Sequence, residues 1–283
     1  WSLGSISFGV TVFFVVGGVA GLWVARLIAA YDARYVIMGG GVVAGASLAL
    51  LGQVQTQWQL FVVYAVFALG YAGAGLVSTT TIVTRWFHQK RAVALSVAST
   101  GLSAGGIIIT PFVKRFIDED GLAATTPWLG LLFVIGVVPI TWFLVKPDPI
   151  AAGWSPDGAR RTVGQAIDAL PGVSFEEAVQ TRFYKAITIG YVLSLGSQVG
   201  GIQQLVKLVE GRTDPSTARF AVTALAATSV IARLIGGRAV QVIEMAKLTV
   251  VLAAMQCVAL VALAFATSTP LIFVSIILFG LTI

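Results

Sequence analysis

Charged residues are scarce in this sequence of 283 residues. Asp, Glu, Lys and Arg make up 11% of the chain, against roughly a quarter in soluble domains, which excludes a single water-soluble globule. The one cysteine, Cys257, excludes an internal disulfide and a cysteine-based metal site. The one histidine, His88, has no acidic cluster beside it, so we expect no metal and no cofactor.

Catalytic and nucleotide-binding motifs are also missing. There is no phosphate-binding glycine motif, which argues against an ATP-driven pump. The apolar segments hold no Ser/His/Asp set and no paired carboxylates, so an enzyme is not expected. What the chain has instead is 57% hydrophobic residues, a mean hydropathy of +0.93 and 31 glycines. This composition predicts an all-α polytopic membrane protein whose helices pack closely.

Nine apolar runs predict the membrane spans, because a helix needs about 20 apolar residues to cross the hydrocarbon. A polar central loop, 146–182, separates the fifth run from the sixth. The ninth run begins at Pro270 and continues to Ile283. The eight full spans are predicted at 3–25, 35–51, 60–83, 92–112, 128–145, 184–206, 217–235 and 248–266.

Basic residues alternate between the loops and predict the orientation. Twelve of the 18 Lys and Arg residues lie on one side of the predicted spans and four on the other. Cytoplasmic loops carry the excess of positive charge, so the first side is expected to be cytoplasmic. The twelve are Arg26, Arg34, Arg85, Lys90, Arg91, Lys146, Arg160, Arg161, Arg182, Lys185, Arg238 and Lys247, and the four are Lys114, Arg115, Lys207 and Arg212.

Five stretches of sequence resemble the major facilitator superfamily, and within it the monocarboxylate transporter and oxalate:formate antiporter group. They are Trp1-Ser2 with Ile6-Ser7, the loop 21–34, the segment from Arg85-Trp86-Phe87 and Lys90-Arg91 through Gly101 and Gly105 to Pro111, Pro156-Asp157-Gly158, and Arg233 with Gly236 and Gly237. The resemblance implies a fold of two pseudo-symmetric six-helix halves. Residues 1–145 would hold helices 2–6 and residues 183–283 helices 7–9 with part of helix 10, so the chain is expected to be a fragment.

Arg233 is the first candidate for substrate binding, because an arginine inside a membrane helix costs roughly 2.5–3.5 kcal/mol and needs a reason. It could bind a carboxylate with two parallel hydrogen bonds, or its side chain could extend to the cytoplasmic interface. The resemblance favours the first, since the group's helix 8 arginine binds the substrate carboxylate. Ser229 stands where monocarboxylate transporters have an aspartate that helps carry the proton, which puts proton coupling by this pair in doubt.

Polar residues interrupt the sixth predicted span. Ser197, Gly201 and Gln204 share one face at helical spacing, and Gln198 lies beside them. These side chains could line a cavity and bind substrate, or they could bond neighbouring helices. Both interpretations stay open. Gln204 aligns with a histidine of many relatives, which would remove another titratable group.

The loop from Arg26 to Arg34 is a candidate gate. It keeps Arg26, Leu27 and Arg34 of the family's pattern but has Ala29 where the family has an acid. In the family that acid locks the outward-facing state, so either the lock is weakened here or Asp32 has taken it over. Arg85 belongs to the same predicted gate. A plain charged turn is the alternative.

Gly101, Gly105 and Pro111 lie in the fourth span and are expected to serve packing and bending rather than ligand contact. The two glycines form a GxxxG pair, which permits close backbone approach. Pro111 is expected to stop or kink the helix near its outer end.

Together these features predict a secondary transporter of small organic anions, mono- or dicarboxylates, that works by alternating access. Proton symport and anion exchange both remain open, with protons as one choice of coupling ion. Efflux of a hydrophobic or drug-like compound is an alternative, as is a non-transporting sensor or scaffold of the same fold. The expected partners are the organic anion and the lipid bilayer, and no nucleic acid is expected. The protein is expected to be a monomer in a bacterial inner membrane.

Overall fold

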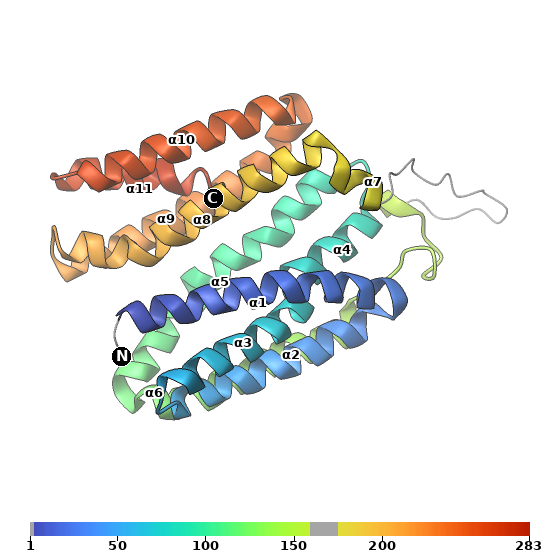
Figure 1. The fold of residues 1–283 in the computed structure, drawn as a ribbon, viewed down its shortest axis with the longest axis horizontal. Coiled ribbons are helices and arrows are strands. Elements are labelled where there is room, and N and C mark those ends of the chain that lie inside the picture. Colours follow the sequence, from blue (N-terminus) through green and yellow to red (C-terminus); the bar gives the residue numbers. More distant parts are fainter. Residues whose placement is uncertain (1–2, 159–174) are drawn as a thin grey trace. The chain divides into compact units, whose positions relative to one another are not determined.

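The regular structure is helical. A computed structural model describes residues 3–158 and 175–283, and its α-helices are labelled in Figure 1. Trp1, Ser2 and residues 159–174, on which part of the sequence analysis drew, lie outside the described residues. The helices are α1 (Leu3–Ala30), α2 (Ala33–Leu50), α3 (Gln57–Ala74), α4 (Leu76–Trp86), α5 (Arg91–Asp120), α6 (Leu122–Leu144), α7 (Phe175–Gln180), α8 (Arg182–Glu210), α9 (Pro215–Val242), α10 (Met245–Phe265) and α11 (Thr269–Gly280).

Within residues 3–158 and 175–283, seven helical stretches are long and apolar enough to cross a membrane. Each overlaps one of the expected spans: Gly4–Ala30, Ala33–Gln53, Gln57–Trp86, Arg91–Asp120, Leu122–Leu144, Phe220–Val242 and Met245–Phe265. α8 covers the expected sixth span in length, but its serines and glutamines make it less apolar than the seven. α11 covers the start of the ninth and has 12 residues.

The chain divides into two compact units. The first comprises residues 1–99 and 108–161, and the second comprises residues 100–107 and 162–283. The second unit therefore takes in a short central segment of α5 together with α8 to α11.

Glycines bring α2 and its neighbours into backbone contact in the first unit. A Cβ added to Gly40 of α2 would lie 2.6 Å from the carbonyl oxygen of Gly70 in α3. A Cβ added to Gly45 would lie 2.8 Å from the carbonyl oxygen of Gly130 in α6. Since side chains are excluded at these points, the helix backbones approach closely, as is common where helices associate in lipid.

The predicted glycine pair in α5 behaves differently. A Cβ added to Gly101 or Gly105 would meet no described atom within 4 Å outside its own helix, so the packing role of this pair stays a prediction. Pro111 does not stop the helix, because α5 continues to Asp120 and carries the ion pairs Lys114–Asp118 and Arg115–Glu119 in its last turns. Proline is tolerated inside membrane helices when the freed backbone groups find other partners.

The third predicted span consists of two helices that are separated at Gly75. The Gly75 N–H closes α3 on the Tyr71 carbonyl at 2.7 Å, and the fully buried Ser78 hydroxyl of α4 donates to the carbonyl of Gly73. A Cβ at Gly75 would lie 2.5 Å from the Tyr71 carbonyl oxygen. The Gly75 bond is the last regular i→i−4 bond of α3, and the Ser78 hydroxyl satisfies the Gly73 carbonyl beyond it. The close approach at Gly75 requires glycine.

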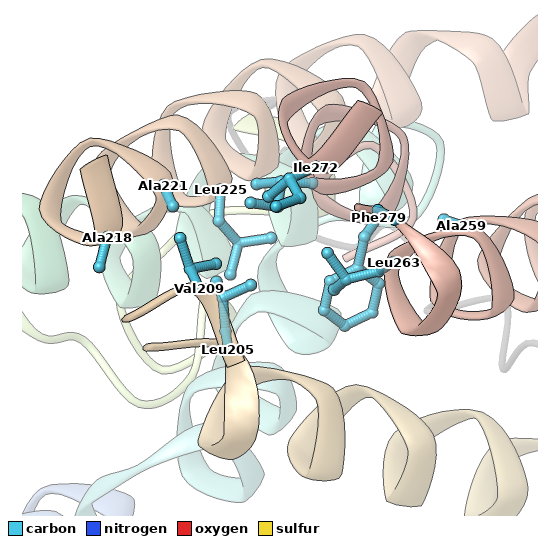
Figure 2. Close-up of a cluster of buried hydrophobic side chains, with 11 residues drawn as sticks. Leu205, Val209, Ala218, Ala221, Leu225, Ala259, Leu263, Ile272 and Phe279 are labelled. Atoms are coloured by element: carbon cyan, nitrogen blue, oxygen red, sulfur yellow. The ribbon is translucent and has the colours of Figure 1, made fainter. Parts of the chain in front are cut away.

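A hydrophobic cluster holds the second unit together (Figure 2). The cluster brings together Leu205 and Val209 of α8, Leu225 of α9, Leu263 of α10 and the fully buried Phe279 of α11. Arg212, in the turn between α8 and α9, donates to three carbonyls at the end of α10, each at 2.8 Å, which are those of Leu263, Ala264 and Ala266. These carbonyls have no partner within a helix, so the arginine caps α10.

Candidate functional site

Arg233 lies within α9 and is half-buried. Its Cα is nine residues before the end of the helix at Val242, or about 14 Å at 1.5 Å per residue. Its Nε donates to the Ser229 hydroxyl, one turn earlier, at 3.4 Å. The guanidinium is thus turned back toward the start of α9, the direction that helical side chains normally take.

Ser229 connects Arg233 to a further polar group. The Ser229 side chain is 3% exposed, and its hydroxyl lies 2.9 Å from the hydroxyl of Ser103. Ser103 belongs to the segment of α5 that groups with the second unit. The structure therefore joins two of the predicted substrate-binding residues, Arg233 and Ser229, and adds Ser103, which the sequence analysis did not single out.

The polar face of α8 is bonded to one residue of α10, Gln256. The Gln256 amide oxygen accepts from the Ser194 hydroxyl at 3.0 Å and from the Gln198 amide at 3.3 Å. Its nitrogen donates to the Ser194 carbonyl at 2.9 Å and to the Ser197 hydroxyl. Gln256 is 4% exposed, so these partners replace water completely.

Gln256 was missed in the sequence analysis, and a signal for it existed. It is the one glutamine in the run 248–266, where the other residues apart from Thr249 and Cys257 are apolar, and a buried amide needs partners. Of the other residues on the predicted face of α8, Gly201 packs against Phe279, where an added Cβ would lie 2.8 Å from the ring. Gln204 is exposed.

The predicted gate residues form two separate contacts. Asp32 begins α2 by accepting from the Arg34 N–H at 2.9 Å, and its carboxylate pairs with the Arg34 guanidinium at 2.8 Å. The hydrogen bond from this guanidinium lowers the pKa of the Asp32 carboxyl. Arg85, in the last turn of α4, donates instead to the carbonyl of Ile28 at the end of α1, at 3.1 Å.

Two arginines of the gate also lie over tryptophan rings. The guanidinium carbon of Arg34 is 5.6 Å from the ring centroid of Trp142 in α6, and that of Arg26 is 5.7 Å from the ring centroid of Trp23. These are cation–π distances. In this structure Asp32 therefore pairs with Arg34 of the same turn, and Arg34 in turn contacts α6.

The start of the central loop is attached to the turn between α4 and α5. Both carboxylate oxygens of Asp157 accept from this turn, with the backbone N–H groups of His88, Gln89 and Lys90 at 3.0–3.4 Å. The bond from Gln89, then those from Lys90 and His88, lowers the pKa of the Asp157 carboxyl. The ring N–H of Trp86 donates to the Lys146 carbonyl at 2.7 Å. Residues 146–158 thus pack with the first unit.

Comparison with known proteins gives a family match over the whole chain. A family model described as Major Facilitator Superfamily matches residues 1–283. The MFS-type transporter hasB of Aspergillus fumigatus is 30% identical over 110 residues, 38% of this chain and 24% of that protein. The oxalate:formate antiporter of Oxalobacter formigenes is 27% identical over 119 residues, 41% of this chain and 28% of that protein. The fujikurins efflux protein of Gibberella fujikuroi is 27% identical over 121 residues, 41% of this chain and 25% of that protein.

In these matches the chain spans about a quarter of the length of the curated relatives. They include an antiporter of organic anions and an efflux protein, so the predicted likeness to one group within the family stays a prediction. The family match agrees with the helical structure and with the seven apolar stretches of spanning length found among the described residues. The chain belongs to the major facilitator superfamily, a family of multi-pass membrane transporters and not of enzymes.

Proposed function

We propose that this protein moves small organic anions, mono- or dicarboxylates, across a membrane by alternating access, and that Arg233 binds the carboxylate. The observation that carries the proposal is the position of Arg233, half-buried inside α9 with its guanidinium directed along the helix toward Ser229. A side chain that merely reached the cytoplasmic interface would extend toward the end of α9. A guanidinium that is held inside the helical bundle can offer a carboxylate two parallel N–H groups.

Anion exchange is the favoured coupling mode. Ser229, at the position where the resembling group carries an aspartate, is buried and bonded to Ser103 and Arg233. A serine hydroxyl does not titrate in the physiological range, so this pair has no proton to move. The relative from Oxalobacter formigenes is an oxalate:formate antiporter, which supports exchange.

Efflux of a hydrophobic compound is the second candidate. The similarity to the fujikurins efflux protein favours it. The relatives named above are fungal and bacterial, so the expected bacterial inner membrane remains a prediction. The expected monomeric state also remains a prediction.

Transport assays in proteoliposomes discriminate between these functions. We expect vesicles loaded with unlabelled oxalate or succinate to exchange it for labelled anion, and a protonophore to leave the exchange rate unchanged. Inhibition by the protonophore would favour proton symport. Flux of a hydrophobic dye without competition by carboxylates would favour efflux. If no solute is transported, the remaining function is that of a non-transporting sensor or scaffold.

The gate is proposed to operate through the end of α1. Arg85 already donates to the carbonyl of Ile28, so an acid at the neighbouring position 29 would lie close to it. Ala29→Asp should therefore stabilise the outward-facing state and reduce labelling, from the cytoplasmic side, of a cysteine placed on the cavity face of α8. Asp32→Ala is the control for the other contact: if Asp32 has taken over the lock, its removal alone should shift the labelling the opposite way. Unchanged labelling in both variants would reduce the loop to a charged turn.

A further inference from the structure

The hydrogen bonds of Gln256 fix the orientation of two amide groups. A backbone carbonyl can only accept, so the group that faces the Ser194 carbonyl at 2.9 Å must be the nitrogen of Gln256. The oxygen of Gln256 then faces the Gln198 side chain, which must present its nitrogen there, at 3.3 Å. Rotating the Gln256 amide by half a turn would place its oxygen against the Ser194 carbonyl oxygen. Rotating the Gln198 amide would place its oxygen against the Gln256 oxygen.

A second carbonyl fixes Gln198 in the same sense. The Gln198 nitrogen also donates to the carbonyl of Thr282, just beyond α11, at 3.2 Å. Its two N–H groups are thereby both used, one on Gln256 and one on Thr282. Among the described residues no donor to the Gln198 amide oxygen is found, and the side chain is only partly buried. What Gln198 can offer a ligand is therefore an acceptor.

We infer that Gln256 is a positioning residue of the substrate site: it holds the Gln198 amide so that its oxygen meets the ligand, and the site prefers organic acids that carry a hydroxyl group. This inference rests on the proposed function, because it takes Gln198 to contact the substrate. Arg233 supplies donors for the carboxylate, and a bare carboxylate has no proton to give to Gln198. A hydroxyl group on the same acid supplies that missing donor.

The preference is measurable with pairs of acids that differ by one hydroxyl. In proteoliposomes that contain the intact transporter, kcat/KM is measured for lactate against propionate and for malate against succinate. We expect the hydroxy acid to be favoured in at least one pair by roughly 2- to 12-fold, the range that one neutral hydrogen bond supplies.

Three variants separate this role from simple packing. Gln256→Met keeps the side-chain length and removes the amide that orients Gln198, so the preference should fall to about 1. Gln198→Met removes the acceptor itself and should give the same ratio, which keeps the test valid if Gln256→Met does not fold. Gln203→Met changes an exposed glutamine of the same helix and should leave the ratio unchanged.

The outcomes are distinct. No preference in the unmodified protein, or equal slowing of both acids in the Gln256 and Gln198 variants, overturns the inference and leaves these residues as bonds between helices. If organic acids are still carried and Arg233→Lys still slows them, the proposed function survives that result. Failure of every organic acid to be transported or to compete overturns both.

Discussion

Replacing Arg233 by lysine tests the proposed carboxylate site most directly. The substitution keeps the positive charge and most of the side-chain length. It removes the planar fork that can form two parallel bonds, and it removes Nε, which donates to Ser229 at 3.4 Å. The charge that membrane insertion must accommodate is unchanged, so the variant should still insert.

The expected loss follows from the bonds that are removed. A hydrogen bond between charged groups contributes about 1.5–3 kcal/mol, and lysine can replace only one of the two bonds to the carboxylate. At 1.4 kcal/mol per factor of ten, kcat/KM for organic-anion transport should fall by roughly 10- to 100-fold. Loss of the Ser229 contact adds to the effect, because the ammonium group is then less well oriented.

The assay compares Arg233→Lys with Arg238→Lys in proteoliposomes at equal protein density. Arg238 is on the same helix, is exposed and lies nearer the end of α9, the end predicted to be cytoplasmic, so its replacement controls for the chemical change alone. Rates within about twofold of the unmodified protein for both variants would refute the reasoning and assign Arg233 to the membrane interface.

Three further predictions concern stability and topology. Asp157→Asn should lower the free energy of unfolding by roughly 1 kcal/mol at neutral pH. The pKa of the Asp157 carboxyl is lowered in the folded state, so its contribution to stability is present above the ordinary value of 3.8. That contribution is lost as the pH falls through the folded-state pKa. The melting curves of the two proteins should therefore converge in acid, and a gap that persists there would contradict the role of the carboxylate. Arg212→Met should cost about 2 kcal/mol by uncapping α10, whereas Lys207→Met, with the same charge change at an exposed residue, should cost little; equal melting shifts would show an effect of charge alone. In a cysteine-free background, a cysteine at Glu119 should react with an impermeant thiol reagent from outside and one at His88 only after permeabilisation, and the reverse pattern would overturn the predicted orientation.

The helices could be predicted from sequence because burial in lipid demands long apolar runs, and such runs are visible without knowledge of their partners. The break at Gly75 was not predicted, since the run 60–83 has the length of one span despite the polar stretch from Ser78 to Thr81. The close approach of Gly75 to the Tyr71 carbonyl becomes visible only in the structure. Pro111 was expected to stop or kink its helix. It does not stop the helix, since α5 continues for nine residues past it, and the kink stays a prediction. The lost hydrogen bond is one of many in a long helix.

The candidate site was predictable in part for a similar reason. Arg233 is conspicuous as a charge in an apolar run, whereas the importance of Gln256 depends on which residues of α8 face it. Spacing on α8 grouped Ser197 with Gly201 and Gln204, but only Ser197 of these bonds to Gln256, while Gly201 packs against Phe279. Pairings between helices depend on their relative rotation, which the sequence of one helix does not specify.

The glycine contact between α2 and α3 has a mechanical consequence. At Gly40 and Gly70 the two helices touch through backbone atoms, so there are no side-chain rotamers at this point whose rearrangement could absorb a shear between them. The two helices should therefore move as one rigid body when the transporter changes state. Strain from such a motion would concentrate where the chain is already interrupted, at the turn around Asp32 and at the break at Gly75, and these are the places where single substitutions should alter the speed of the transport cycle without touching the substrate.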